Sequence, residues 1–505
     1  MTAHPDLLHS FLDRAAADRP DAPAVSSGGE TLTYRALDDG SRRLAHRLLE
    51  RGLVRGDRLV VCAPGSLVQP ALIYAASRAG VTFSLLHEQT RGIQLDHVLD
   101  DCEPALLVTD DADAVAAAER RGVRTASTTA LTQAAFADTP VPDQAPPGPL
   151  AVDPVCLIYT SGTTSLPKAV VSTHQQLTFA ARAIHSVLGY RPADIVYSPL
   201  PLSFDYGLYQ LFLSTLAGAH VTLGRPAEVG PALLTNLVRA EATVLAAVPS
   251  VAEALARLLR RSRGRGAPPL RLLTNTGAAM PAETLAALRS ALPDLRVQLM
   301  FGLTECKRAT IMEPDGDLTR PGSSGRALPG TEVFVLDEDG NRLAPGEIGE
   351  IVVRGPNVMA GYWRRPELTA QRFRRVEGLF PQLHTGDYGW VDEDGYLYFD
   401  GRRDDIYKEN GFRVSATEVE AAARRVPGVT AAAVLPPQHP APALLFVVGD
   451  IGAGQVLDGM REQIEEFKIP GHCLPLDALP LTGNGKVDRK ALAALTEEAV
   501  RVRTR

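Results

Sequence analysis

The chain has 505 residues, of which 45% are hydrophobic and 22% are charged, and its formal net charge is −7. A chain of this length exceeds what one hydrophobic core supports, so we expect two or more domains. The negative charge argues against a nucleic-acid-binding protein, because no basic stripe could drive the release of counterions.

Cysteine spacing and the N-terminal segment bear on the cellular compartment. The 5 cysteines are scattered and show no CxxC spacing, which argues against a disulfide framework and a zinc site and is typical of a reducing compartment. The N-terminus lacks the basic and apolar regions of a signal peptide. No apolar run approaches the ~20 residues needed to span a bilayer. We therefore expect a cytoplasmic protein with no membrane partner and no nucleic-acid partner.

The first part of the chain alternates helical patterns with short apolar segments. Apolar residues recur at helical spacing over 7–19, 36–52 and 67–81. Short strands are expected at 22–27, 30–34, 58–64, 81–86, 105–110 and 155–160. Strands that are apolar on both faces are typical of a parallel sheet covered by helices. The segment 125–153, rich in Thr, Ala and Pro, is predicted to be a connection.

The same alternation restarts after residue 160 and continues to residue 302. Helices are expected at 174–190, after Phe204, at 231–242 and at 251–261, and strands at 195–200, 220–224, 244–249, 270–277 and 297–302. Two successive series of this kind predict an α/β protein with a large N-terminal domain of two doubly wound layers.

From about Gly325 the pattern changes to antiparallel strands. Strands are expected at 331–343 and 346–355, and a hairpin at 387–401 turns at Asp394-Gly395. This indicates a small antiparallel, barrel-like unit. The charged string GRRDD then marks a boundary, and a compact α+β region of about one hundred residues follows. We therefore predict a core domain over 1–400 and a C-terminal domain over 401–505.

The stretch YTSGTTSLPKAV at 159–170 carries the clearest chemical signal. It places hydroxyl side chains, Gly162 and Lys168 between an apolar run and a following helical pattern. Such a turn can offer backbone N–H groups, hydroxyls and a positive charge to a phosphate. It matches neither GxxxxGK[ST] nor GxGxxG, so a Walker loop and a Rossmann fingerprint are not supported. A polar surface loop is the alternative.

Seven strings in order widen this signal to nearly the whole chain: YTSGTTSLPKAV, TGAAMP, FGLTEC, GEIGEIVVRGPNVMAGYW, HTGDYG, GRRDDIYKENGFRVS and LTGNGKVDRKAL. With them the chain resembles the adenylate-forming superfamily of acyl-CoA synthetases, nonribosomal peptide synthetase adenylation domains and luciferases. The resemblance implies a small mobile C-terminal lid, and ATP and Mg²⁺ as cofactors. It also implies attack of a small carboxylic acid on the α-phosphorus, giving an acyl-adenylate and pyrophosphate, and then acyl transfer to a thiol.

The resemblance also implies roles for single residues in ATP binding. The implied ATP-binding residues are Thr160, Ser161, Gly162, Thr163, Thr164, Lys168, Gly277, Ala278, Ala279, Phe301, Gly302, Thr304, Asp387 and Arg402. In this assignment the hydroxyl loop holds the β- and γ-phosphates, Phe301 lies on adenine, Thr304 bonds the α-phosphate, and Asp387 and Arg402 hold the ribose. Glu305 is the implied Mg²⁺ ligand, since Mg²⁺ prefers oxygen.

The superfamily has glycine where Ser165 and Ala169 stand. Glycine adopts positive φ at low cost, so a shifted loop geometry is expected here without loss of phosphate binding.

The C-terminal domain is implied to supply moving parts. Lys486 would bridge the carboxylate and the α-phosphate during adenylation. Asp404 aligns with the hinge about which the small domain rotates between the two steps, and Lys408 would face the site in the second pose. The implied catalytic residues are therefore Lys486, Thr304, Glu305 and Lys408.

Substrate identity stays open at this point. The implied pocket residues are Phe204, Asp205, Tyr206, Met300 and Arg308. Asp205 either binds the α-ammonium of an amino acid or caps a helix N-terminus. Arg308 either favours an acid with a second anionic group or points outward into a surface ion pair. A small or aromatic acid, amino- or hydroxy-substituted, is the expectation.

The acyl acceptor is open as well. Coenzyme A, the phosphopantetheine arm of a separate carrier protein, and an amine are the candidates. The chain ends soon after Lys486, so a free-standing enzyme of specialised metabolism is expected, with a stand-alone amino-acid adenylation enzyme as the alternative. A non-catalytic nucleotide-binding protein and a luciferase-like oxygenase are the competing functions from other classes.

Overall fold

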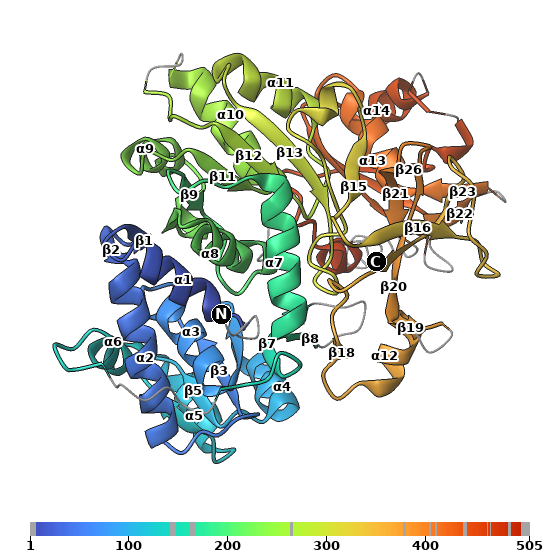
Figure 1. Ribbon diagram of the computed structural model, residues 1–505. Helices are drawn as coiled ribbons and strands as arrows, with labels where there is room; N and C mark the ends of the chain where they lie inside the picture. The colour runs from blue at the N-terminus through green and yellow to red at the C-terminus, as the bar shows by residue number, and fades with distance from the viewer. Residues whose placement is uncertain are drawn as a thin grey trace. The chain divides into compact units, whose positions relative to one another are not determined.

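The computed structural model describes most of the chain (Figure 1). The described ranges are 7–141, 148–160, 167–262, 266–376, 380–402, 406–409, 412–437, 442–461, 463–464, 466–482 and 486–495. The chain forms two compact units. Unit 1 comprises Met1–Val333 and Val353–His384, and unit 2 comprises Phe334–Val352 and Thr385–Arg505. The predicted α/β class, with a large N-terminal and a smaller C-terminal part, is confirmed.

The first sheet of unit 1 has the strand order β18-β8-β7-β4-β3-β5-β6. Its strands are β3 Arg58–Cys62, β4 Thr82–Leu86, β5 Leu106–Val108, β6 Arg124–Ala126, β7 Pro154–Thr160, β8 Lys168–Thr173 and β18 Gly361–Tyr362. The pairs from β6 to β7 are parallel, whereas β7, β8 and β18 pair in antiparallel fashion. The associated helices are α2 Tyr34–Glu50, α3 Val68–Ala79, α4 Gly92–Cys102, α5 Ala112–Glu119 and α6 Thr128–Ala135.

The second sheet of unit 1 contains the order β13-β12-β11-β9-β10-β1-β2. These strands are β1 Pro23–Ser27, β2 Glu30–Thr33, β9 Ile195–Ser198, β10 His220–Leu223, β11 Val244–Ala247, β12 Leu272–Asn275 and β13 Arg296–Phe301. All neighbours are parallel except β1 and β2. The chain then turns back in the antiparallel strands β14 Thr310–Ile311 and β15 Ser323–Ala327.

Several helices accompany this second sheet. They are α1 Ser10–Asp18, α7 His174–Leu188, α8 Asp205–Ala217, α9 Ala232–Arg239, α10 Pro249–Ser262 and α11 Ala282–Ala291, with short 3-10 turns at Pro226–Glu228 and Gly316–Leu318. Helix α12 Pro366–Arg372 and strand β19 Phe373–Arg375 follow later in the chain. The two predicted β/α series are therefore both present.

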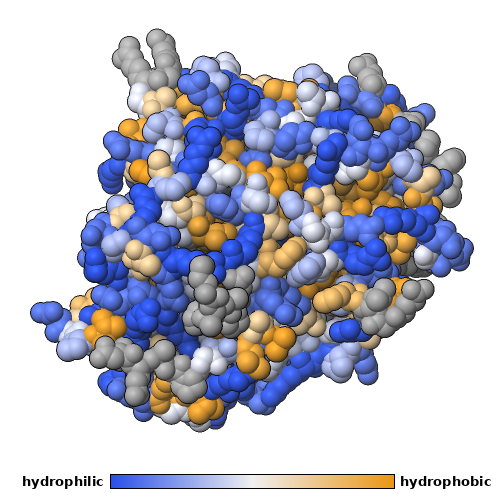
Figure 2. Space-filling view, viewed as in Figure 1, coloured by the Kyte–Doolittle hydropathy of each residue, from blue (hydrophilic) through white to orange (hydrophobic). Residues whose placement is uncertain are grey.

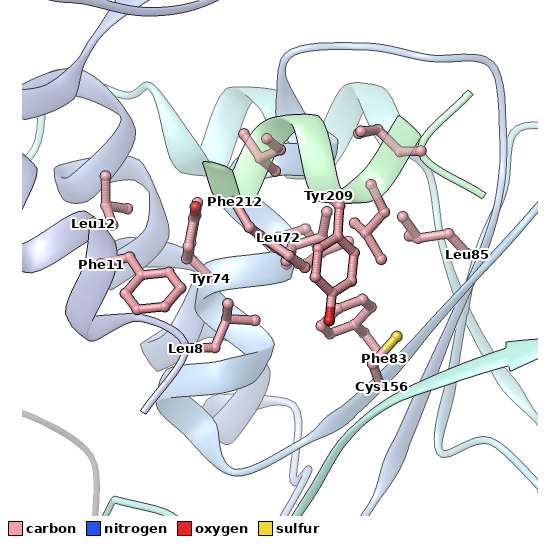
Figure 3. Close-up of a cluster of buried hydrophobic side chains, with 14 of the residues drawn as sticks. Leu8, Phe11, Leu12, Leu72, Tyr74, Phe83, Leu85, Cys156, Tyr209 and Phe212 are labelled. Atoms are coloured by element: carbon pink, nitrogen blue, oxygen red, sulfur yellow. The ribbon is translucent and has the colours of Figure 1, made fainter. Parts of the chain in front are cut away.

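Helix α8 lies in the shared core of the two sheets. Residues 205–215 are all buried, so this helix has no solvent-facing side over that length. Its Tyr209 and Phe212 pack with Phe11, Tyr74 and Phe83 from α1, α3 and β4 (Figure 3). Burial of one such aromatic side chain stabilises the fold by about 1.5–3 kcal/mol. The N-terminus of α8 is thereby held firmly beside the second sheet.

Two local predictions were wrong. The segment 125–153 is more than a connection, because it contains the end of β6 and helix α6, whose N-cap Ser127 accepts a hydrogen bond from the Ala130 N–H at 3.1 Å. The hydroxyl loop is followed by a strand rather than by a helix: β8 returns antiparallel to β7 with Thr160 opposite Lys168. The described residues on either side of the loop therefore belong to paired strands.

Unit 2 begins with the neighbouring strands β16 Glu332–Leu336, β17 Gly349–Arg354, β20 Pro381–Val391 and β21 Tyr396–Arg402. The expected turn at Asp394-Gly395 is confirmed, with Gly395 at φ 83°. A hairpin of β22 Ile406–Glu409 and β23 Phe412–Ser415 precedes α13 Ala416–Arg425 and the sheet of β24 Val429–Leu435, β25 Leu444–Gly449 and β26 His472–Pro475. Helix α14 covers Ala453–Met460, and a 3-10 turn follows at Glu466–Lys468.

On the face shown in Figure 2, hydrophilic side chains cover most of the surface and apolar ones are interspersed among them. Among the helices that the structure describes, none combines the length and the apolar character that crossing a bilayer requires.

Candidate active site

The loop after β13 folds back sharply on itself. Gly302 begins it, and a Cβ atom there would overlap the carbonyl oxygen of Lys307 and lie 2.9 Å from Arg308 Cα, so glycine is required by the close approach. Lys307 has a φ of 65°, and the Ala309 N–H donates to the Phe301 carbonyl at 2.9 Å. The turn buries 306–308 and leaves Thr304 and Glu305 partly accessible.

Three segments that are distant in the sequence meet at Glu305. The Tyr362 hydroxyl donates a hydrogen bond to Glu305 Oε1 at 2.6 Å, and Lys168 Nζ lies 3.9 Å from the same oxygen. Lys168 Nζ also lies 4.0 Å from the centre of the Tyr362 ring, a cation–π distance. Burial and the neighbouring carboxylate raise the pKa of Tyr362, so its phenol stays protonated and donates.

A second charged cluster lies at the N-terminus of α8. Asp205 Oδ1 is 3.0 Å from Lys307 Nζ, and Oδ2 is 3.5 Å from Arg308 Nη1. The exposed fractions of Asp205, Lys307 and Arg308 are 6%, 0% and 4%. We call these three residues the Asp205 cluster. It holds two cations and one carboxylate inside the protein.

Tyr206 packs against this cluster. Its hydroxyl donates to the Thr274 carbonyl at 2.7 Å, and the Arg308 guanidinium lies 4.9 Å from its ring centre. Of the other expected pocket residues, Phe204 packs edge-on against the Tyr206 ring, and Met300 is buried in the same core. Phe204, Asp205, Tyr206 and Arg308 therefore lie together, and Met300 belongs to the same hydrophobic core.

The positions of Asp205 and Arg308 exclude one of the two alternatives left open for each residue. The N-cap of α8 is Phe204, and the Asp205 carboxylate faces Lys307 and Arg308, so Asp205 is not a helix cap. Arg308 is buried beside Tyr206. The alternative in which it points outward into a surface ion pair is therefore also excluded. Both residues point into the protein.

The remaining unit 1 candidates stand at one edge of the second sheet. Gly277, Ala278 and Ala279 follow β12 and are exposed, with Gly277 at φ 92°. Phe301 ends the neighbouring parallel strand β13, and Asp205 follows β9 in the chain. Ligands of open α/β sheets bind at the carboxyl ends of the strands. The arrangement therefore presents these groups where a ligand is expected.

The unit 2 candidates are Asp387, Arg402, Lys408 and Lys486. Asp387 in β20 stands opposite Arg402 in β21, and its N–H donates to Thr385 Oγ1 at 3.0 Å. Lys486 is exposed, and a backbone pair ties it to Thr482, whose N–H donates to the Lys486 carbonyl at 2.7 Å. The side chains of Arg402 and Lys408 lie outside the described part. Ser161, Gly162, Thr163, Thr164 and the expected hinge residue Asp404 are outside the described residues altogether.

The donor set at Glu305 fits a magnesium ion that is shared with a ligand. In the described ranges, no three His, Cys, Asp or Glu side chains gather in a metal-binding group. Mg²⁺ is usually bound through one or two carboxylates together with substrate phosphates and water, rather than by an all-protein cage. A single accessible carboxylate beside a lysine is consistent with that mode.

Tyr362 was missed by the sequence reasoning. It stands in the string GEIGEIVVRGPNVMAGYW, which carried the resemblance without a role for its tyrosine. Its contact with Glu305 joins residues 57 positions apart, and only the tertiary structure reveals it.

Sequence comparison decides the family. The model of the family described as AMP-binding enzyme matches residues 12–363, and that of its C-terminal domain matches residues 418–486. The chain belongs to the AMP-binding enzyme family. It is accordingly an adenylate-forming, AMP-forming acid ligase: it binds ATP, converts a carboxylate to an acyl-adenylate with release of pyrophosphate, and then transfers the acyl group.

Relatives of this AMP-binding enzyme include ligases with two kinds of acceptor. A feruloyl-CoA synthase of Amycolatopsis sp is 31% identical over 491 residues, covering 95% of this chain and 97% of the relative. An L-proline–[L-prolyl-carrier protein] ligase of Pseudomonas fluorescens is 31% identical over 511 residues, covering 97% of this chain and 99% of the relative.

Solved structures agree with this assignment. The complex of VinN with L-aspartate is 39% identical with a TM-score of 0.71, covering 79% of this chain and 99% of VinN. ATP-bound MatB from Rhodopseudomonas palustris is 30% identical with a TM-score of 0.86, covering 97% of this chain and 98% of MatB.

Proposed function

We propose that this AMP-forming ligase activates a small acid that carries both an ammonium group and a second carboxylate. L-Aspartate is the reference compound for this class. The observation that carries the proposal is the composition of the Asp205 cluster, in which two buried cations share one carboxylate.

The charge balance of the cluster favours an anionic ligand. Buried charges are stable only when they are paired and hydrogen-bonded. Arg308 Nε is buried and has no hydrogen-bond partner in the part of the chain that the structure describes. A ligand carboxylate near Arg308 and Lys307 would supply the missing negative charge. Asp205 would then offer an oxygen to the ligand ammonium.

One relative supports the same chemistry. VinN, 39% identical to this chain, has been solved with L-aspartate, which carries one ammonium and two carboxylates. The buried cluster in this chain offers one group of opposite charge for the ammonium and two cations for the carboxylate that does not react. The second carboxylate of the ligand would be left free for adenylation.

Contacts with the nucleotide are proposed for the residues that the resemblance implies, taken unit by unit. In unit 1, Lys168 and Thr304 would contact the phosphates, Phe301 the adenine face, and Gly277, Ala278 and Ala279 the adenine edge, with Gly302 shaping the loop. In unit 2, Asp387 and Arg402 would hold the ribose. Glu305 would hold Mg²⁺, which when bound neutralises charge on the triphosphate.

The second step is proposed to end at a thiol. The relatives named above use coenzyme A or a carrier protein, and either thiol fits the same chemistry. We assign residues 401–505 to a lid that turns about Asp404, presenting Lys486 for adenylation and Lys408 for transfer. Transfer to an amine is the alternative, and product analysis by mass spectrometry distinguishes it from a thioester.

A substrate panel tests the proposal. Acid-dependent ATP–pyrophosphate exchange is compared for L-aspartate, succinate, β-alanine, ferulate and a long-chain fatty acid. We expect L-aspartate or a close homologue to give the highest kcat/KM, because succinate lacks the ammonium and β-alanine lacks the second carboxylate. Preference for ferulate or for the fatty acid would contradict the assignment of the Asp205 cluster.

A further inference from the structure

The segment 355–365, between β17 and α12, crosses over the loop that carries Glu305. We call it the strap. Asn357 is fully buried, and its Nδ2 donates to the carbonyls of Cys306 at 3.3 Å and Arg308 at 3.0 Å. The Met359 N–H donates to the Glu305 carbonyl at 2.9 Å. The strap therefore fixes the backbone of the loop at three carbonyl groups.

The same strap is also a strand beside β8. The Ala360 N–H donates to the Val171 carbonyl at 3.0 Å, and the Trp363 N–H donates to the Ala169 carbonyl at 2.9 Å. Tyr362 stands opposite Val170 in this antiparallel pair. Because Lys168 begins β8, the strap connects the backbone of the lysine with the backbone of the glutamate.

Tyr362 makes the corresponding connection through its side chain. Its hydroxyl donates to Glu305 Oε1 and its ring face lies 4.0 Å from Lys168 Nζ. The ring is itself held by Phe373, edge-on with ring centres 5.3 Å apart, and the Tyr362 N–H donates to Thr369 Oγ1 at 3.0 Å. The orientation of the phenol is therefore set by packing.

The distances show what this contact achieves. A charge-assisted hydrogen bond between an ammonium and a carboxylate is normally about 2.7–2.9 Å long. Lys168 Nζ and Glu305 Oε1 instead remain 3.9 Å apart. The Tyr362 hydroxyl is hydrogen-bonded to Glu305 Oε1, and the Tyr362 ring attracts the Lys168 ammonium. Both contacts keep the ammonium and the carboxylate from closing to hydrogen-bond distance. A triphosphate needs the two charges separately, the ammonium for its oxygens and the carboxylate for its cation.

We propose that Tyr362 is a positioning residue that holds the Glu305 carboxylate and the Lys168 ammonium apart, ready for a metal-bound triphosphate. The inference rests on the proposed nucleotide site and adds a residue to it. Without the hydroxyl, the lysine and the glutamate close into a direct ion pair, and the carboxylate becomes less available to the cation.

Tyr362→Phe tests the inference, because it keeps the ring and removes only the hydroxyl. ATP binding is measured by calorimetry with Mg²⁺ and, separately, with a chelator and no metal. Removing a group that hydrogen-bonds to a metal-ligating side chain typically lowers the metal affinity by about 10–100-fold. We expect Tyr362→Phe to weaken Mg²⁺-supported ATP binding by that factor and to weaken metal-free ATP binding by a smaller factor, because the closed ion pair then engages only the Lys168 ammonium that the phosphates would contact.

Tyr34→Phe is the matched control. Tyr34 is another buried tyrosine of unit 1, and its hydroxyl donates to the Ala219 carbonyl at 2.6 Å. Both variants should show similar shifts of the thermal midpoint, but only Tyr362→Phe should change the dependence on Mg²⁺. In a Glu305→Gln background, Tyr362→Phe should not further change the increase in ATP affinity that Mg²⁺ gives, since the two residues act as one unit.

Three results would overturn the inference. Tyr362→Phe could keep the wild-type affinity for ATP with Mg²⁺, it could weaken binding equally with and without metal, or it could add fully to Glu305→Gln. A wild-type protein that binds no ATP even with Mg²⁺ would instead contradict the proposed nucleotide site. The two failures are therefore distinguishable.

Discussion

Asp205 is the residue on which the charge balance of the pocket depends. It faces Lys307 at 3.0 Å and Arg308 at 3.5 Å, and all three side chains are buried. Removing the carboxylate leaves two cations unpaired in the interior, whereas removing Arg308 leaves one neutral ion pair. The two substitutions are therefore expected to act on different properties.

Asp205→Asn is expected to destabilise the protein. Breaking a buried ion pair by removing one partner typically costs about 3–5 kcal/mol, because a buried charge is left uncompensated. The thermal midpoint should fall clearly below that of wild type. An unchanged midpoint would show that water reaches the cluster.

Arg308→Met should leave the fold intact and change the substrate preference. Hydrogen bonds to charged groups are worth ~1.5–3 kcal/mol, so kcat/KM for L-aspartate should fall about 10–100-fold. The value for β-alanine, which has no second carboxylate, should change little. Equal losses for both acids in the exchange assay would contradict the proposed contact with that carboxylate.

The loop at 302–308 is the element that places the nucleotide and substrate groups side by side. It turns Thr304 and Glu305 outward and Lys307 and Arg308 inward, and this reversal depends on the close approach of Gly302 to the Lys307 carbonyl. A change in this turn should therefore disturb both groups at once.

Gly302→Ala is expected to abolish most activity in the exchange assay while the protein still folds. The added Cβ must displace the backbone at Lys307, and overpacking of this kind typically costs about 1–3 kcal/mol. Gly65→Ala is the matched control, because a Cβ there meets no atom within 4 Å. Full activity of Gly302→Ala would show that the loop tolerates another geometry.

Local elements were largely predictable because their signals are local. Apolar periodicity predicts the helix over 174–190 and the strand over 58–64, and both are present. Residues 169–171 form an apolar run too short to distinguish a strand from a helix start, so β8 was missed. Helix α6 was missed because its Thr- and Ala-rich sequence resembles a connection, although Ser127 is a capping signal.

The site was only partly predictable for a related reason. Motif strings indicate Glu305 and Lys168 one at a time, but their common contact with Tyr362 depends on the pairing of β18 with β8. The orientation of Arg308 depends on the burial of α8, and the residues after FGLTEC do not reveal it.

At the level of the whole chain, two compact units contribute residues to one proposed reaction. Lys486 belongs to unit 2 and lies next to Val487, which pairs with Leu481 in a β-bridge. If this lysine serves adenylation alone, the two steps of the reaction should respond differently to its loss.

Lys486→Ala is expected to lower the rate of acyl-adenylate formation by a factor of about 10²–10³, the usual effect of losing one preorganised donor. Thioester formation from a supplied acyl-adenylate should be largely retained. Near-normal exchange activity in this variant would contradict the role assigned to Lys486.

The central claim is that this family member adenylates an amino dicarboxylic acid. The most direct measurement is mass spectrometry of the products formed from ATP and L-aspartate with Mg²⁺ and no acyl acceptor. The account predicts aspartyl-adenylate and pyrophosphate, with much less adenylate from succinate. Absence of aspartyl-adenylate, with adenylate formed readily from an acid that lacks an ammonium group, would contradict it.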